Sequence, residues 1–364
     1  TCLMSTSSSA TNGNTAAAAA ASKPSPWPSL QVPPDAKINY DQNNNDNKII
    51  RSVESSFNYC DDSVTKMYTR RDLQGSDDTI HGSKWSTVTK NVHNARLTNP
   101  VLDTRGFQLV NSPVIHGENK IDFRNSQQVI DEYYPQCISL VKQQTGAAIV
   151  HCFDHNVRVS GSQGKTEGDT TLQQPLGVVH NDYTHVSAPR RLEQLGQPPK
   201  ANDSMKNELG DKPLLDPNIV QDVLDGKRRF VFCNVWRNIS PQKPVLQFPL
   251  ACVDATTQSL DEMLTFQIIY ADRIGENYFS KMVPKHKWNY FPEMRHDEAL
   301  LLKQWDSHGN LALKKEPDND QNNMEEFKST FSLHSAFQDP SSPKDAPPRE
   351  SIEVRCVLIW DKEE

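Results

Sequence analysis

Short strand-like segments recur through most of this chain of 364 residues and limit the folds open to it. From residue 147 onward, alternating or continuously apolar runs follow one another about every ten to fifteen residues, separated by turn-forming residues. The clearest runs cover residues 229–236, 299–306 and 352–360. Helical spacing of three and four is concentrated towards the front, above all in residues 127–145, before Gly146. This pattern predicts an α+β protein centred on a β-sandwich or barrel.

The triplet His180-Asn181-Asp182 says most about chemistry. Side chains at positions i and i+2 of a strand point to the same face, so His180 and Asp182 can both reach one metal ion. A lone His-x-Asp pair arises often by chance, but His334 supplies a second imidazole further along the chain. Two imidazoles and one carboxylate can occupy one face of an octahedral ferrous ion and leave three positions open. The three residues therefore favour a non-haem Fe(II) oxygenase.

Arg349 and Ser351 extend this prediction to a co-substrate. They follow His334 after a proline-rich turn over residues 340–348, so a strand, turn and strand would bring Arg349 back beside His334. A 2-oxoacid that chelates iron leaves its distal carboxylate in need of a charge partner. A guanidinium offers that carboxylate two parallel donors, and the Ser351 hydroxyl adds a third.

Several short motifs resemble those of the Fe(II)/2-oxoglutarate-dependent hydroxylases and desaturases that include fungal gibberellin desaturase-like proteins and the cephem 7α-methoxylase component. The resemblance extends from about Gly82 to Trp360, and the run over residues 346–353 is its most specific part. The matching segments are Thr145-Gly146-Ala147, Phe153-Asp154-His155, Val179-His180-Asn181-Asp182-Tyr183-Thr184, Asn234-Val235-Trp236-Arg237, Pro249-Leu250-Ala251, Arg273-Ile274-Gly275-Glu276, residues 288–294, Asp306-Ser307 and residues 347–355.

The resemblance implies a double-stranded β-helix, or jelly roll, and a reaction that consumes 2-oxoglutarate and O₂. It implies iron ligation by His180, Asp182 and His334, and 2-oxoglutarate binding by Arg349 and Ser351. The organic substrate is expected to be a small specialised metabolite whose unactivated C–H bond is oxidised. Hydroxylation, desaturation or oxidative cyclisation, as when a kainoid synthase cyclises a prenylated amino acid, are the possible outcomes.

Five further residues match family segments near the expected metal strands and are candidates for substrate binding. They are Arg190, Arg191, Trp236, Arg237 and Tyr290. A carboxylated substrate would suit Arg190 or Arg237, although a core-rim ion pair is at least as common a use for a buried arginine.

Other histidines compete with His334 for the third ligand position. His286, His296 and His308 each lack a following Arg-x-Ser strand. His185 lies at an odd offset from both His180 and Asp182, so on a strand it would face away from them. Two other functions stay open: a metal hydrolase that uses zinc and a bound water, and a catalytically idle jelly-roll binding module. Either would leave Arg349 without a role.

We expect one catalytic domain over residues 56–364, with the jelly-roll core from about residue 145 and a mobile polar insertion over about residues 311–330. Residues 1–55 are rich in Ser, Ala, Asn, Thr and Pro and poor in large apolar side chains, which predicts a disordered head. A targeting segment is the alternative, although Arg51 is the first arginine.

Composition limits the partners. No apolar run approaches the roughly 20 residues needed to cross a bilayer. The seven cysteines lack metal-type spacing, which favours free thiols in the cytoplasm or another reducing compartment. With 46 acidic against 39 basic residues, a nucleic-acid partner is disfavoured. We expect a monomer or weak homodimer that acts on a small molecule.

Overall fold

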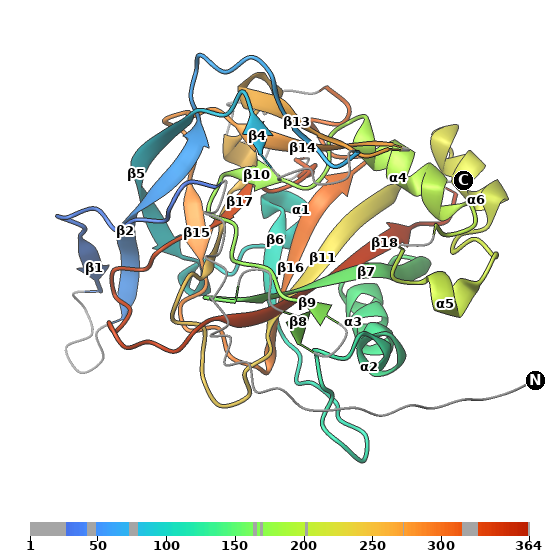
Figure 1. The fold of residues 1–364 in the computed structure, drawn as a ribbon, viewed down its shortest axis with the longest axis horizontal. Coiled ribbons are helices and arrows are strands. Elements are labelled where there is room, and N and C mark those ends of the chain that lie inside the picture. The colour runs from blue at the N-terminus through green and yellow to red at the C-terminus, as the bar shows by residue number, and fades with distance from the viewer. Residues whose placement is uncertain are drawn as a thin grey trace, which may run out of the picture.

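The computed structural model describes residues 27–41, 49–72, 79–162, 166–167, 170–200, 203–271, 273–314 and 327–362. Within these ranges the strands form two large sheets and one small hairpin (Figure 1). The larger sheet runs, in spatial order, β1 (Ile38–Tyr40), β2 (Ile50–Cys60), β5 (Trp85–Asn94), β15 (Trp288–Tyr290), β12 (Leu250–Val253), β17 (His334–Ala336), β10 (His180–Asn181), β14 (Ile274–Ser280), β13 (Met263–Ile269), β3 (Met67–Arg70) and β4 (Ile80–His81). The smaller sheet runs β6 (Phe107–Asn111), β16 (Glu298–Asp306), β11 (Phe230–Asn238), β18 (Glu350–Ile359) and β7 (Ile149–Val159), and the hairpin joins β8 (Thr166–Glu167) to β9 (Thr170–Thr171).

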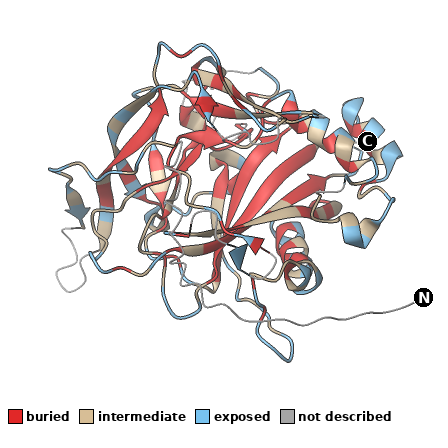
Figure 2. Ribbon diagram, in the orientation of Figure 1, coloured by how far each residue is buried: buried red, intermediate tan, exposed pale blue. Residues whose placement is uncertain are grey.

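Alternation along β18 explains how the smaller sheet is covered on both faces. Ile352 and Val354 point to one face, where they pack with residues of the helical segment over residues 126–145. Val357 and Ile359 point to the other face, where they join a core cluster that also contains residues of the larger sheet. The two sheets therefore face each other across a shared core, and the strands around it are largely buried (Figure 2).

The helices lie outside this core. They are η1 (Ala95–Leu97), α1 (Leu102–Arg105), α2 (Ser126–Gln128), η2 (Val129–Tyr133), α3 (Tyr134–Thr145), α4 (Ser187–Leu195), α5 (Lys206–Leu209), α6 (Pro217–Leu224), η3 (Ala255–Thr257) and η4 (Leu260–Glu262). The helix expected over residues 127–145 is present and ends at Gly146, which has the left-handed φ of 68°. Just before Pro135 its backbone widens to a π-helical turn, because a proline cannot donate the usual helical hydrogen bond.

Two expected boundaries are wrong. The head was expected to extend to residue 55, but β1 and the first residues of β2 lie before that position. The core was expected to start near residue 145, but β5 pairs with β15 and β6 pairs with β16. Both errors arise because strands from the front of the chain join the same sheets as strands that come much later in the sequence. Residues 1–26 and 42–48 of the expected head lie outside the described residues.

The expected insertion over residues 311–330 is described only at its two ends. Leu311, Phe327 and Thr330 are buried there, so both ends pack into the protein body. Residues 315–326, the middle of the expected mobile segment, lie outside the described residues.

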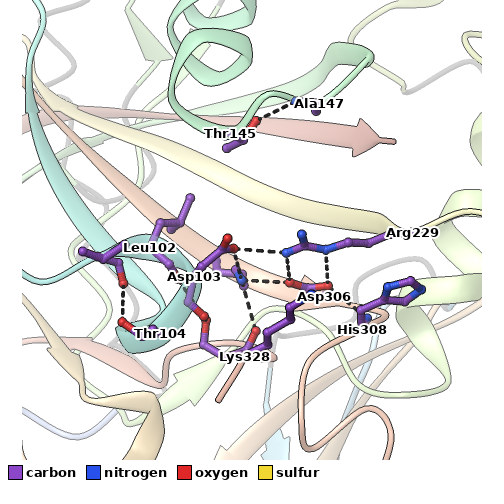
Figure 3. Close-up of polar contacts among 12 residues, drawn as sticks. Leu102, Asp103, Thr104, Thr145, Ala147, Arg229, Asp306, His308 and Lys328 are labelled. Carbon is purple, nitrogen blue, oxygen red and sulfur yellow. Dashed lines mark hydrogen bonds and ion pairs between the residues drawn. The ribbon is translucent and has the colours of Figure 1, made fainter. Parts of the chain in front are cut away.

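A buried ion cluster fixes the return of the chain after this segment. Figure 3 shows Asp306 held by Arg229, with Asp103 beside them. Lys303 donates to Asp306 at 2.8 Å and to the Ser329 carbonyl at 3.1 Å, which links β16 to the chain entering β17. The Asp306 side chain is fully buried. Although burial alone raises its pKa, Lys303 and Arg229 bring the pKa of Asp306 down to about 2 from an ordinary value of 3.8.

We predict that the Asp306→Asn variant is destabilised by about 3 kcal/mol at pH 7, because Arg229 and Lys303 lose their buried carboxylate and keep only the more exposed Asp103 as an ion-pair partner. The folded-state pKa of Asp306 is lowered, so its contribution is complete above about pH 4 and is lost as the pH falls towards 2. Urea unfolding from pH 7 downward should therefore show the difference between variant and parent shrinking in acid. The exposed Asp297→Asn, which loses an ion pair with Arg295, is the control and should change stability by less than about 0.5 kcal/mol. An equal cost in both variants would contradict the prediction.

The described cysteines are all buried free thiols, in line with the expectation from their spacing. None of the helices in the described ranges is both long and apolar enough to cross a membrane.

Candidate functional site

His180, Asp182 and His334 come together on the larger sheet. Strands β10 and β17 are neighbours, and His180 and His334 are directly paired between them. One ligand atom from each of the three residues lies within 4.8 Å of the other two. In the described part of the chain, this is the one group of three or more His, Cys, Asp or Glu side chains that could hold a metal ion.

Both imidazoles are oriented in the same way. The Nδ1 of His180 lies 2.8 Å from the Val178 carbonyl, and the Nδ1 of His334 lies 3.1 Å from the Ser332 carbonyl. A carbonyl can only accept, so each Nδ1 carries the proton and each Nε2 keeps a free lone pair. Burial, followed by the neighbouring His334, lowers the pKa of His180 to about 4, and burial also lowers the pKa of His334. Both rings are therefore neutral near pH 7, as metal binding requires.

Asp182 is held differently from the expected strand geometry. Strand β10 ends at Asn181, so Asp182 lies in the bend after it, yet its Oδ1 is still 3.8 Å from the Nε2 of His180. Its other oxygen accepts a hydrogen bond from Asn234 at 3.3 Å and lies 3.7 Å from the Nε of Arg355. Burial alone would raise the pKa of Asp182, but Arg355 and the two histidines bring it to about 2. The carboxylate is thus charged, with one oxygen turned towards the imidazoles.

Arg349 reaches the same place from the opposite sheet. It precedes β18, whereas His334 lies on β17, so the two face each other across the core instead of lying side by side as expected. A small cavity of about 20 Å³ is lined by Arg349, His180, Asp182 and His334 together with Arg158. Arg349 is 2% exposed and donates to the Phe248 carbonyl at 2.5 Å, while its Nε has no hydrogen-bond partner among the described residues.

Two guanidinium groups therefore share one small buried space. Burial and the nearby Arg158 lower the pKa of Arg349 to about 9, and burial also lowers the pKa of Arg158. Glu353 lines the same cavity, and burial, followed by the charge of Asp182, raises the pKa of this carboxyl group. The arrangement suits a small anion with more than one acceptor oxygen.

Ser351 does not line this cavity as expected. Its hydroxyl donates at 3.5 Å to the carbonyl of Arg158, the residue opposite it on β7. Arg158, whose side chain does line the cavity, belongs to none of the sequence motifs that indicate the site.

The five substrate candidates separate into two groups. Trp236 lines the small cavity, with its ring 5.6 Å from the guanidinium of Arg349. Arg190 and Arg191 line a larger cavity of about 320 Å³ that also reaches Asp182.

Arg237 and Tyr290 lie apart from these two cavities. Arg237 follows Trp236 on β11 and so points to the opposite face, where Tyr133, Ser112 and the His296 carbonyl take its hydrogen bonds. Tyr290 is 1% exposed and packs edge-on against Phe337.

The competing histidines also lie outside the triad. The Nδ1 of His185 is 2.7 Å from the Tyr278 hydroxyl, and His286 lies between Glu262 and the Tyr59 hydroxyl. The Nδ1 of His296 bonds the Asn238 carbonyl, and His308 follows Asp306 in a turn. None belongs to the metal-binding group found in the described residues.

Comparisons with known proteins point to one class of enzyme. A family model described as an oxidoreductase/YMDC permease-like domain matches residues 54–210 and 212–359. The chain is 30% identical over 282 residues to the Fe(II)/2-oxoglutarate-dependent dioxygenase nvfI of Aspergillus novofumigatus, covering 76% of this chain and 84% of the relative. It is 28% identical over 284 residues to the hydroxylase/desaturase efuI of Hormonema carpetanum, covering 72% and 80% respectively.

A solved structure extends the similarity to three dimensions. The iron and alpha-ketoglutarate-dependent endoperoxidase NvfI superposes with a TM-score of 0.64 at 26% identity. The superposition covers 86% of this chain and 99% of that chain.

Proposed function

The chain belongs to the Fe(II)/2-oxoglutarate-dependent dioxygenases, and on this premise we propose that His180, Asp182 and His334 hold the iron while Arg349 and Arg158 bind 2-oxoglutarate. The enzyme uses Fe(II), 2-oxoglutarate and O₂. We further propose that its two facing sheets form a double-stranded β-helix, and that it oxidises a C–H bond of a small metabolite.

One observation carries the assignment of residues. Two free imidazole nitrogens and a charged carboxylate converge beside a buried guanidinium whose Nε lacks a partner among the described residues. The donor set suits Fe(II), and the unpaired donor suits the distal carboxylate of a 2-oxoacid. A zinc hydrolase would use the triad but would leave Arg349 without a ligand.

Iron and 2-oxoglutarate, when bound, supply the activation of O₂ that lets a hydrogen atom be removed from an unactivated carbon. In the simplest outcome, substrate R–H, 2-oxoglutarate and O₂ give R–OH, succinate and CO₂. The protein residues orient these partners. The Val178 and Ser332 carbonyls fix the two imidazoles, Asn234 and Arg355 hold the outer oxygen of Asp182, and Trp236 covers the guanidinium of Arg349.

Succinate formation tests this function. The purified protein with Fe(II), 2-oxoglutarate and air should release succinate, and a mixture of candidate metabolites should accelerate that release. Replacing Fe(II) by Zn(II) should abolish it. Turnover that proceeds with zinc and without 2-oxoglutarate would instead support the hydrolase.

Asn234 is predicted to position the metal carboxylate. Its Nδ2 donates both to Asp182 and to Glu353, so it fixes Asp182 from β11 without contacting the metal itself. The Asn234→Leu variant is expected to bind Mn(II), a redox-inert substitute for Fe(II), about 10–100-fold more weakly. Titration followed by electron paramagnetic resonance would measure this. Asn238→Leu, on the same face of β11 but bonded only to backbone groups, should keep the parental affinity if it folds. Equal losses in both variants would show that the effect is structural.

A further inference from the structure

The larger cavity beside Asp182 contains two arginines that form no ion pair with a carboxylate of the described residues. It lies between α4 and the hairpin of β13 and β14, two elements that are in contact (Figure 1). Asp182 is the residue that this cavity shares with the smaller one containing Arg349. A molecule in the larger cavity would therefore lie next to the proposed iron site.

Most of the charges in this cavity are already neutralised within the protein. Arg355 pairs with Asp154 at 2.6 Å, and Arg191 pairs with Asp203 at 3.2 Å. Asp182 belongs to the triad. The two ion pairs account for two positive and two negative charges, and the triad accounts for the negative charge of Asp182.

Two guanidinium groups of this cavity remain without an ion pair. Arg190 on α4 makes one hydrogen bond, at 3.4 Å, to the carbonyl of Ile274, and Arg273 lies with its guanidinium 4.6 Å from the centre of the Tyr270 ring. Neither forms an ion pair with a carboxylate in the described ranges. Because the guanidinium of Arg190 reaches the backbone of the residue that follows Arg273, its charged end lies near the point where the Arg273 side chain begins.

The one remaining acid of the cavity cannot neutralise both. The carboxylate of Glu276 accepts hydrogen bonds from the Thr184 hydroxyl at 3.2 Å and from Gln267 at 3.3 Å. Four arginines and four acids line the cavity in all, so once Asp182 is assigned to the metal, Arg190 and Arg273 face the single carboxylate of Glu276.

From this balance we infer that the organic substrate carries a carboxylate, which Arg190 and Arg273 bind at the rim while the carbon to be oxidised points towards Asp182. This inference rests on the proposed function, because it assumes that the metal lies at the triad. A planar guanidinium recognises a carboxylate through two parallel hydrogen bonds, and the Tyr270 ring keeps Arg273 in place. The two arginines thus set substrate orientation and take no part in oxygen chemistry.

Benzoate is a suitable probe, with benzamide as its uncharged match. The protein is first loaded with Mn(II) and N-oxalylglycine, an inert analogue of 2-oxoglutarate, so that Arg349 is already occupied. Benzoate is then titrated and followed by nuclear magnetic resonance. We expect saturable binding of benzoate, and binding of benzamide at least about tenfold weaker.

The double variant Arg190→Gln/Arg273→Gln should weaken benzoate binding about tenfold and leave the affinity for N-oxalylglycine unchanged. The control is Arg295→Gln, which removes an exposed arginine that does not line this cavity. Equal binding of benzoate and benzamide, absence of benzoate binding, or an unchanged affinity in the double variant would each overturn the inference. Failure of Mn(II) and N-oxalylglycine to bind the parent protein would instead overturn the proposed function.

Discussion

The His334→Ala variant is expected to lose iron-dependent succinate formation. Because removal of a group that merely orients a metal ligand costs about 10–100-fold in metal affinity, removal of the ligand itself should cost at least about 100-fold. The effect should appear both in Mn(II) binding, measured by electron paramagnetic resonance, and in succinate released from 2-oxoglutarate under air.

His308→Ala is the matched control for this variant. His308 lies in the turn after β16, outside the triad. It should retain parental metal affinity and turnover. If His334→Ala kept its iron-dependent activity, or if His308→Ala lost it equally, the assignment of His334 as a ligand would be wrong.

The Arg349→Met variant is expected to raise the KM for 2-oxoglutarate by about 10²–10³-fold, since it removes a buried charge-assisted contact. Arg349→Lys should recover only part of the affinity, because an ammonium lacks the planar pair of donors. Arg158→Met should shift the KM in the same direction. Steady-state succinate assays at saturating Fe(II) would measure all three.

Although Arg349→Met should weaken 2-oxoglutarate binding, it should not lower the free energy of unfolding. Burial and Arg158 both disfavour the charged form of Arg349, so replacing it by an apolar side chain should leave the protein without 2-oxoglutarate at least as stable as the parent. Urea unfolding tests this. The control is Arg295→Met, at an exposed position, which should change neither the free energy of unfolding nor the KM for 2-oxoglutarate. A variant that loses stability and keeps its KM would show that Arg349 is a structural residue.

The sequence reveals the metal triad more fully than the rest of the site. The i, i+2 spacing groups His180 with Asp182, and the Arg-x-Ser strand that follows His334 distinguishes it from the other histidines. The position of Arg349 is harder, since the sequence does not show that β17 and β18 belong to different sheets. Chain proximity suggests neighbouring strands, whereas the fold places the two residues on opposite walls.

Arg158, Glu353 and Arg355 surround the site although the sequence motifs assign them no role in it, yet each belongs to a strand in which polar and apolar residues alternate. On β18 the polar residues Ser351, Glu353 and Arg355 alternate with Ile352 and Val354. On β7, Asp154, Asn156 and Arg158 repeat the same spacing. A strand with charged side chains on one face and apolar side chains on the other usually predicts that the polar face is exposed to solvent. Here that face lines a buried site, which only the pairing of β7 with β18 and the opposing sheet make evident.

The central position of β18 has a consequence for how this protein is made. β18 is the last strand along the sequence described, yet it lies inside the smaller sheet, between β11 and β7. During synthesis on the ribosome, β7 and β11 are released long before the strand that joins them, so their unpaired edges stay available for aggregation until β18 itself has been released. Contacts between such distant segments also slow folding. Recombinant production should therefore benefit from slow translation at low temperature and from added chaperones.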